Sequence, residues 1–477
     1  MQNTTYKSII ILLLILLSKQ GIFAQSNTLF FMDGLHQSNY LNPAYQNQCN
    51  SFLGLPGFSG VSVDIANTGF DYNDLIHNGE GIYKDSLVLD IENIKMKLKN
   101  SNYLMTGAQI PILGIGFWTK NSYFTFDISN KTRARISYPE DLVKLIDGNG
   151  NYIGESNPLE IKGVGPNVLN YNEIAFGLSK QITHRLTIGG KFKILSGVFS
   201  AESTNSSIKL YTQEDTYAMR LETDLKLNIS APVVFEYDNN GMIIGAEIDS
   251  ALTVSSLFSP KNLGLAIDMG AVYQFNDKVK FYGSVTDLGF IRWKNNAQNI
   301  SQSGSFEFSG LTLDSVWTNS DYDEFQAIAD SLSEFFTFTQ SYSKYNTYLN
   351  TNIFLGATYD IGNFMNFGLL SKTYFFDRKI HQAFTLSANF SPVKWFCGTL
   401  SYSYINREYR NIGLGIGLKA KGMQFYVLTD NLNVAFKPKD AKVARIQFGI
   451  NFYFGCGKRE NFSMLKDKKP EKSIDFM

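Results

Sequence analysis

The sequence predicts an all-β protein, a transmembrane antiparallel β-barrel of about 14 strands. Apolar and polar residues alternate strictly over several long stretches. After residue 24, none of the chain approaches the roughly 18 consecutive apolar residues of a membrane-spanning helix. Gly (39 residues), Phe (38) and Tyr (26) are plentiful, whereas Pro (11) is scarce. This composition favours one large β architecture over a string of small domains.

The first 24 residues have the form of a secretory signal peptide. Lys7 precedes the apolar run 9–17, and small Ala24 stands at a cleavage position. The run is far shorter than the roughly 20 residues that a spanning helix needs. A buried N-terminal helix is the alternative, but Lys19 interrupts the apolar segment and no amphipathic face is visible. We therefore expect export, with the mature chain beginning after Ala24.

The stretch 217–229 alternates most clearly. Its odd positions are Tyr217, Met219, Leu221, Thr223, Leu225, Leu227 and Ile229. Its even positions are Ala218, Arg220, Glu222, Asp224, Lys226 and Asn228. Successive strand side chains point to opposite faces, so one face is apolar and the other charged. The stretch exceeds the usual strand of about 5–6 residues and covers the about 9–11 that a tilted membrane strand requires.

The same alternation recurs along the chain. The candidate strands are 112–119, 122–129, 170–181, 185–196, 217–229, 265–275, 279–291, 349–359, 364–376, 384–390, 395–405, 412–418, 422–430 and 446–454. Another could lie at 303–312. Backbone groups in lipid must all be paired, so such strands close into a ring. Because bacterial barrels have even strand numbers, we predict about 14, with roughly 12 to 16 left open.

Two stretches have apolar residues at helical spacing, 139–146 and 323–335. Both start with acidic residues, which is typical of helix N-termini. We interpret them as short helices that cover long loops, with docking of a partner as the alternative. The polar, lysine-rich residues 457–477 are predicted to form a periplasmic tail.

The three cysteines, Cys49, Cys397 and Cys456, match neither a disulfide framework nor zinc-ligand spacing. Closure of a barrel brings its first and last strands together. A Cys49–Cys456 bridge is therefore one outcome, and three free thiols are the other.

Charge and motif content exclude several functions. Basic and acidic residues are balanced at 43 each, unlike in a nucleic-acid-binding protein. The four histidines show no metal-binding or catalytic spacing. Gly413, Gly415 and Gly417 alternate, which is not the spacing of a nucleotide-binding loop, and we interpret them as a small-residue stripe facing the lumen or a plug. We expect no enzyme activity, no cofactor and no metal.

Charged residues on the inner face would form the lumen wall. The predicted lumen charges are Lys191, Lys193, Arg220, Glu222, Asp224 and Lys226. One interpretation is a charge-selective solute pathway. The other is that these groups pair with one another and with a plug. Their mixed sign argues against a strongly ion-selective pore.

The segment 38–45 contains Asn42-Pro43-Ala44. An early Asn-Pro-Ala in a signal-bearing barrel resembles the N-terminal segment of FadL-type transporters, and also that of the PorV and PorP/SprF barrels linked to type IX secretion. Residues 186–197 and 446–456 are similar to an uncharacterised outer-membrane barrel family of that group. The resemblance spans most of the mature chain.

This resemblance implies a hatch folded into the barrel, with Asn42, Pro43 and Ala44 inside it. Pro43 suits a fixed turn there. The implied organisation is a signal peptide at 1–24, a hatch or plug at 25–100, a barrel at 101–456 and a tail at 457–477. No substrate-site residues carry over.

The function implied is a plugged FadL-like channel in a Gram-negative outer membrane. It would admit small apolar or amphipathic solutes through the lumen and a lateral opening. The alternative is a non-transporting barrel that scaffolds or anchors type IX secretion or cell-surface components. Outer-membrane lipid is the expected partner, joined by secretion or surface proteins under the alternative. The oligomeric state is left open.

Overall fold

The computed structural model describes residues 27–32, 34–79, 81, 84–231, 233–237, 243–248, 261–309, 338–376, 379–405 and 408–456. The predicted signal peptide (1–24), loop helix 323–335 and tail 457–477 lie outside the described residues.

Within these residues, a 20-stranded antiparallel sheet makes up most of the protein. Its strands are β1 (Ser51–Gly54), β2 (Val61–Asn67), β5 (Asn102–Thr119), β6 (Ser122–Tyr138), β7 (Leu159–Lys162), β8 (Gly165–Gln181), β9 (Leu186–Thr212), β10 (Met219–Ser230), β13 (Leu263–Gln274), β14 (Val279–Trp293), β15 (Ala297–Phe308), β16 (Thr339–Ser341), β17 (Tyr345–Tyr348), β18 (Asn352–Ile361), β19 (Met365–Phe376), β20 (Lys379–Val393), β21 (Phe396–Ile405), β22 (Glu408–Ala420), β23 (Met423–Thr429) and β24 (Val443–Phe454). Two separate hairpins pair β3 (Ile76–Asn78) with β4 (Leu87–Leu89), and β11 (Val233–Tyr237) with β12 (Ile243–Ile248).

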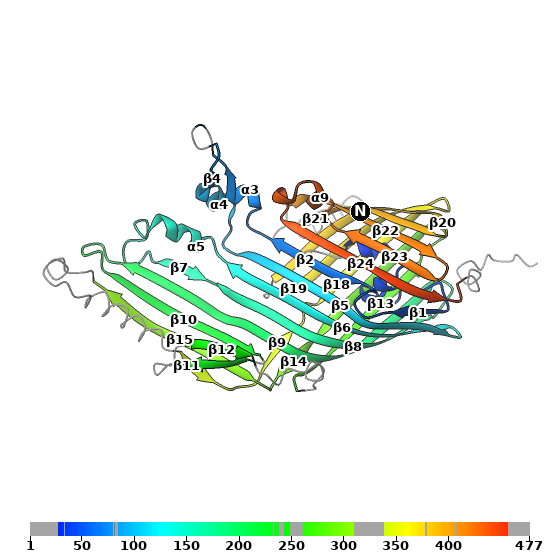
Figure 1. The fold of residues 1–477 in the computed structure, drawn as a ribbon, viewed down its shortest axis with the longest axis horizontal. Coiled ribbons are helices and arrows are strands. Elements are labelled where there is room, and N and C mark those ends of the chain that lie inside the picture. The colour runs from blue at the N-terminus through cyan, green and yellow to red at the C-terminus, as the bar shows by residue number, and fades with distance from the viewer. Residues whose placement is uncertain are drawn as a thin grey trace, which may run out of the picture.

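The sheet closes on itself (Figure 1). Strand β24 pairs with β23 on one side and with both β1 and β2 on the other. The latter two pair in turn with β5, so they occupy one position of the ring, end to end. The ring continues through β6, β8, β9, β13, β14, β18, β19, β20, β21 and β22. The predicted closed antiparallel barrel of 14 strands is confirmed.

Two predictions about which segments form the ring were wrong. The stretch 217–229 forms β10, which pairs with the second half of β9 and with β15, beside the closed ring. The remaining ring position is filled by β1 and β2, which lie inside the 25–100 segment predicted as hatch. Alternation shows that a strand has two different faces but does not show which strand pairs with it. With 27 residues, β9 is long enough to pair with β13 along one half and β10 along the other.

The two ends of the barrel differ. Short turns join β5 to β6, β8 to β9, β13 to β14, β18 to β19, β20 to β21 and β22 to β23, all at the end where β1 begins. The connections around 67–102, 138–165 and 429–443 are longer and lie at the other end. Since short turns face the periplasm in bacterial barrels, we infer that the end with β1 is periplasmic. The strands β7, β10 and β15 project beyond the ring at the outer end (Figure 1).

Short helices lie in the N-terminal segment that precedes β1 and in the outer loops. They are α2 (Asn27–Phe30), η1 (His36–Tyr40), α3 (Tyr72–Leu75), α4 (Ile91–Lys97), α5 (Asp141–Lys144), η3 (Leu145–Asp147), α9 (Asn433–Phe436) and η4 (Pro438–Asp440). The carboxylate of Asp71 caps α3 and that of Asp90 caps α4. The predicted loop helix at 139–146 is present as α5 and η3. In the part of the chain that is described, helices long and apolar enough to cross a membrane are absent.

The two faces of the wall differ in chemistry. On β13, Leu265, Ile267 and Met269 are 49%, 41% and 51% exposed, whereas Ala266 and Asp268 between them are 2% and 1% exposed. The exposed set forms part of an apolar outer band that matches the hydrocarbon of a membrane. The polar and small residues therefore face the lumen.

Candidate functional site

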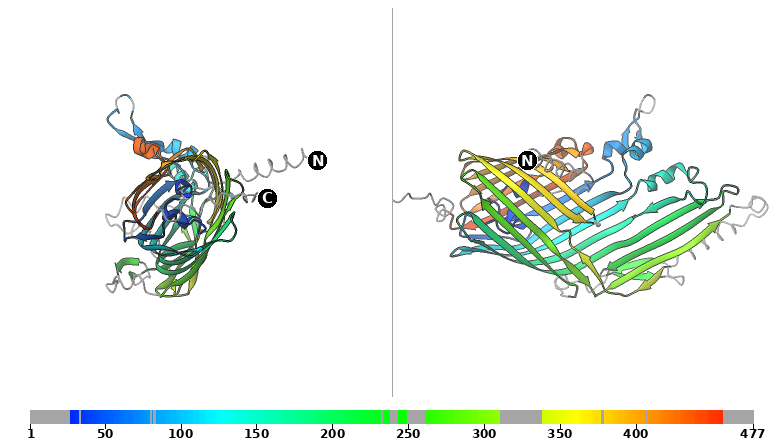
Figure 2. Two further views of the ribbon diagram at one scale, coloured as in Figure 1. Left: turned by 90° about the vertical axis from the view of Figure 1, so that its right-hand side faces the viewer. Right: turned by 180° about the vertical axis from the view of Figure 1, so that it is seen from behind.

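Residues 27–49, hereafter the plug, lie inside the ring (Figure 2). The side chains of Asn27, Phe30, Gln37 and Asn42 are fully buried there. Both α2 and η1 belong to the plug, and the plug contacts the wall near a periplasmic turn at Ala271 of β13. The predicted hatch segment 25–100 is thus divided, because its later residues supply β1, β2 and outer loops.

The Asn42-Pro43-Ala44 motif forms a turn inside the plug. The Ala44 amide donates to Asn42 Oδ1 at 3.0 Å, which is a local turn that asparagine favours. Asn42 Nδ2 donates to the carbonyl of Ala271 on β13 at 3.2 Å. Asn39 Nδ2 donates to the carbonyl of Pro43 at 3.1 Å. The turn is therefore fixed both within the plug and to the wall.

Wall glycines provide the space that the plug occupies. A Cβ on Gly189 would collide with the Pro43 carbonyl, and one on Gly270 would collide with the Asn42 side chain. On the opposite wall, Gly413 meets Thr28 and Gly415 meets Met32. The small-residue stripe predicted on β22 therefore faces the plug at these two positions.

One side of the plug is aromatic. The Phe30 ring stacks on Phe354 of β18 with centroids 5.7 Å apart, and its edge contacts Tyr282 of β14 at 5.9 Å. Phe31, Tyr45 and Leu370 complete the buried cluster. The plug and the β14–β18–β19 wall thus meet through apolar side chains.

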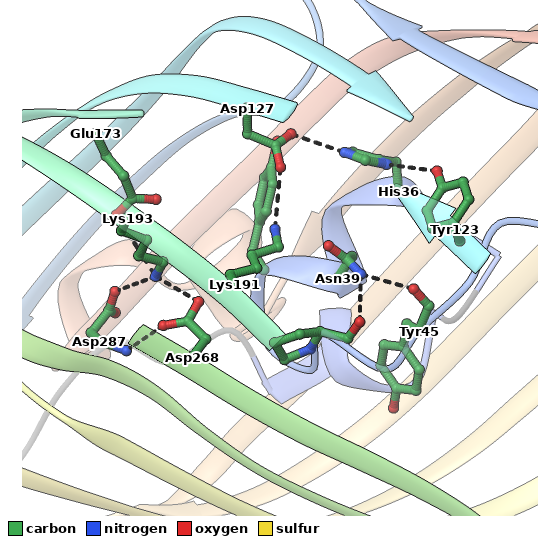
Figure 3. A network of polar contacts seen from close by, with 12 residues as sticks. His36, Asn39, Tyr45, Tyr123, Asp127, Glu173, Lys191, Lys193, Asp268 and Asp287 are labelled. Carbon is green, nitrogen blue, oxygen red and sulfur yellow. Dashed lines mark hydrogen bonds and ion pairs between the residues drawn. The ribbon is translucent and has the colours of Figure 1, made fainter. Parts of the chain in front are cut away.

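The other side of the plug is held by a buried carboxylate (Figure 3). Asp127 on β6 accepts from His36 Nε2 at 3.0 Å and from Tyr40 OH at 3.3 Å, both plug residues. Its second oxygen accepts from Lys191 Nζ of β9 at 3.2 Å. His36 also stacks on Phe52 of β1, with ring centroids 3.7 Å apart. A single wall carboxylate therefore binds two plug side chains and one wall cation.

A second buried charge cluster lies in the wall itself (Figure 3). Lys193 Nζ is 2.6 Å from Asp268, 2.7 Å from Asp287 and 3.7 Å from Glu173. Lys131 contacts Glu173 at 2.7 Å and Asp287 at 3.8 Å. The Asp287 amide donates to Asp268 Oδ1 at 2.7 Å. These contacts join β6, β8, β9, β13 and β14 across the inner face.

The structure brings together only two of the predicted lumen charges. Lys191 and Lys193 lie in the lumen, 4% and 3% exposed, and both pair with carboxylates. The other four, Arg220, Glu222, Asp224 and Lys226, lie on β10, beside the ring. Arg220 pairs with Glu155 and Glu222, and Lys226 with Asp224.

Sequence reasoning did not single out His36, Asp127, Glu173, Asp268 or Asp287 as site residues. A usable signal was present for two of them. Asp127 is the one charged residue in the predicted strand 122–129. Asp268 is the one charged residue in the predicted strand 265–275. A lone carboxylate in an otherwise apolar and small-residue strand needs a buried partner.

Toward the outer end, Tyr374 of β19 takes part in a contact between opposite parts of the wall. It packs in one buried cluster with Tyr103 and Met105 of β5, Ala66 of β2 and Val443 of β24. The strands β20 to β23 separate β19 from β24 along the ring, so this contact crosses the lumen. We call these five residues the outer seal.

The plug is covalently tied at its end. Cys49 forms a disulfide with Cys456, 407 residues later and just past β24. Of the two outcomes left open by the sequence, the bridge is the one present, and Cys397 remains a thiol. Among the described residues, groups of His, Cys, Asp and Glu suited to hold a metal are absent.

A closed barrel with an apolar outer face, a polar lumen and a buried N-terminal plug defines the class of plugged outer-membrane β-barrels. The chain belongs to the family described as "Family of unknown function (DUF5723)", which matches residues 43–430. No curated protein matches the sequence.

Solved structures of similar architecture include three bacterial proteins. The Pseudomonas putida toluene transporter TodX has 8% identity and a TM-score of 0.36, with 91% of this chain and 93% of that chain covered. The Ralstonia pickettii toluene transporter TbuX has 10% identity and a TM-score of 0.38, with 87% and 93% covered. A Pseudomonas aeruginosa FadL homologue has 10% identity and a TM-score of 0.35, with 88% and 94% covered. The resemblance to FadL-type transporters and the resemblance to PorV and PorP/SprF both stay predictions from the sequence.

Proposed function

We propose that this protein is a plugged outer-membrane channel for small apolar or amphipathic solutes. The observation that carries the proposal is how the plug is attached. Its contacts with the wall are hydrogen bonds, one ion-paired carboxylate and side-chain packing, and its covalent connections to the wall lie at residues 49–51, where the chain enters β1 and Cys49 is bridged to Cys456. Such contacts can break and reform while the connection to β1 keeps the plug attached to the wall.

The residues along the lumen favour apolar solutes. Between the plug and the β14–β18–β19 wall lie Phe30, Tyr282 and Phe354, and farther out lie Tyr103 and Tyr374. A solute that displaced the plug toward β6 would meet aromatic rings along this side. Because Lys191 and Lys193 are paired with carboxylates, they offer little selectivity for ions of one sign.

Proteoliposomes test this proposal directly. Purified protein is reconstituted, and influx of a small aromatic hydrocarbon is compared with influx of a sugar of similar size. We expect faster entry of the hydrocarbon than into empty liposomes, with little gain for the sugar. Equal influx of the hydrocarbon with and without correctly folded protein would overturn the proposal.

A second candidate function rests on the outer loops. Large apolar side chains are exposed on these loops, and we call this set the rim patch: Tyr72, Leu87, Leu89, Met96, Ile146 and Phe436. Lys95 pairs with Asp147, and Asn73 bonds Asp440, so the loops that carry these side chains hold together. Exposed apolar patches of this kind are typical of protein docking surfaces.

This patch favours the alternative that the barrel scaffolds or anchors type IX secretion or other cell-surface components. Purification from native membranes separates the two functions. Specific co-purification of a surface protein, lost when Leu87 and Met96 are both changed to Ser, together with no solute influx, would favour the scaffold over the channel.

A further inference from the structure

The outer face of the barrel has a hollow of about 490 Å³ across β6, β8, β9 and β13. Its apolar lining side chains are Phe124, Phe176, Leu178, Phe192, Ile267 and Met269. Each of these is between 37% and 51% exposed. The hollow therefore opens away from the lumen, into the apolar outer band.

The hollow exists because one outward position has no side chain. Gly190 alternates on β9 with Ile188 and Phe192, which are 44% and 47% exposed on the outer face. The nearest atom that a Cβ on Gly190 would meet is the Asp268 carbonyl oxygen, 3.6 Å away. A depression thus lies among large apolar neighbours.

Its depth places it in the leaflet nearer the periplasm. Phe124 lies two residues after the start of β6, Leu178 three before the end of β8, and Gly190 four after the start of β9. These termini are the short turns at the periplasmic end. At about 3.3 Å per residue, these three positions lie within roughly 15 Å of that end, and Ile267, seven residues before the end of β13, lies within roughly 25 Å of it along the strand.

A cation stands at the edge of the hollow. Lys180 is exposed on β8 and shares the outward face of Phe176 and Leu178. It is two residues beyond Leu178, about 7 Å nearer the turn. A lysine at this depth lies where the headgroups of the periplasmic leaflet begin.

We propose that the hollow and Lys180 together bind one phospholipid of the periplasmic leaflet. An acyl chain fills the hollow around Gly190, and the phosphate accepts hydrogen bonds from the Lys180 ammonium. Two features point to this occupant. The hollow is continuous with the lipid-facing band, and the charge at its edge is opposite to that of a phosphate. The site is independent of whether the lumen conducts solutes.

The site also has a structural relation to the plug. Gly189 receives the Asn42-Pro43-Ala44 turn on the inner face, and Gly190 forms the hollow on the outer face. A bound acyl chain would therefore support the thin part of the wall against which the plug turn rests.

Photocrosslinking tests the proposal. The full-length protein is reconstituted with a phospholipid that carries a diazirine near the end of one acyl chain, and labelled residues are mapped by mass spectrometry. We expect labelling concentrated on Phe176, Phe192 and Met269, several-fold above the outward-facing Leu355 and Phe367. Labelling spread evenly over these five residues would overturn the proposal.

Substitutions sharpen the test. G190F fills the hollow and should reduce labelling there to the level of Leu355. G283F is the matched control, because Gly283 also faces outward four residues from a periplasmic turn, and a Cβ there meets only Leu355 at 3.8 Å. K180Q should reduce the phospholipid retained in native mass spectrometry without disturbing packing. Unchanged labelling in G190F, or unchanged retention in K180Q, would each contradict the assignment.

Discussion

The carbonyl group of Pro43 occupies the space that a side chain on Gly189 would need. The two residues are far apart in the chain, yet the plug turn and strand β9 fit because this position carries no Cβ. The next residue, Gly190, faces the opposite side of the wall, where a Cβ would make only an ordinary contact. Adjacent glycines thus have separable roles, one toward the plug and one toward the membrane.

This relationship predicts that G189A displaces the plug turn. The obstructing atoms at Gly189 are backbone atoms of Pro43 and Ala44, which cannot rotate away as the end of a side chain could. Overpacking of this kind costs about 1–3 kcal/mol. We expect a higher conductance in planar bilayers and faster hydrogen exchange at residues 36–45. G190A is the control and should behave as the wild type. Equal conductance of the two variants would show that the turn does not seal the lumen.

The sequence was sufficient to predict the class of fold but not all the neighbours in it. Alternation identified two-faced strands such as β13 and β24, and their lengths indicated a membrane barrel. It could not distinguish β10 from a ring strand, because β10 pairs with the second half of β9 and with β15, and alternation does not report which strands are neighbours. The strands β1 and β2 were missed as wall strands because each is short, at 4 and 7 residues.

The candidate site was predicted less completely. The Asn42-Pro43-Ala44 turn was found through a resemblance, and Lys191 and Lys193 through alternation. Asp127 was overlooked because its role depends on His36, which lies 91 residues earlier and has no regular strand around it. Partnerships of this kind are set by tertiary packing, which no local pattern reports.

Asp127 should be the main polar attachment of the plug. In D127N the buried Lys191 loses its carboxylate, and breaking a buried ion pair costs about 3–5 kcal/mol. We expect a lower thermal unfolding midpoint and faster hydrogen exchange at His36 and Tyr40. The double variant D127N/K191M should recover part of the loss, because no unpaired charge remains. D141N, in the outer loop, is the control. An unchanged midpoint in D127N would contradict this role.

The Cys49–Cys456 bridge should stabilise the folded protein without being needed for the ring. It links positions 407 residues apart, so it restricts the unfolded chain strongly. Typical disulfides contribute about 2–4 kcal/mol. The ring should still close in C49S, because β1 and β2 remain paired with β24.

The measurement is the temperature at which the folded band is lost in gel electrophoresis. We expect this temperature to be lower for C49S than for the wild type. A reductant should lower the temperature of the wild type to the same value and should not lower that of C49S any further. C397S keeps the bridge and should retain the wild-type value. If the reductant lowered the temperature of C49S as much as that of the wild type, the effect of the reductant would not come from the Cys49–Cys456 bridge.

The outer seal lies in series with the plug along the lumen, so the contribution of Tyr374 to the barrier can be tested. Tyr374 is 2% exposed and reaches across the lumen to Tyr103 and Met105. The plug stays in place in Y374A, so this variant alone should leave the conductance close to that of the wild type. In G189A/Y374A the conductance should exceed that of G189A alone.

The control for this series is Y348A, because Tyr348 is 74% exposed on the outer part of the wall and lies outside the seal. It should change neither the wild-type conductance nor that of G189A. If Y374A by itself opened the lumen, the plug would not be a complete barrier and the outer seal would be the main one. If G189A/Y374A conducted no more than G189A, the contact across the lumen would be packing without a sealing role.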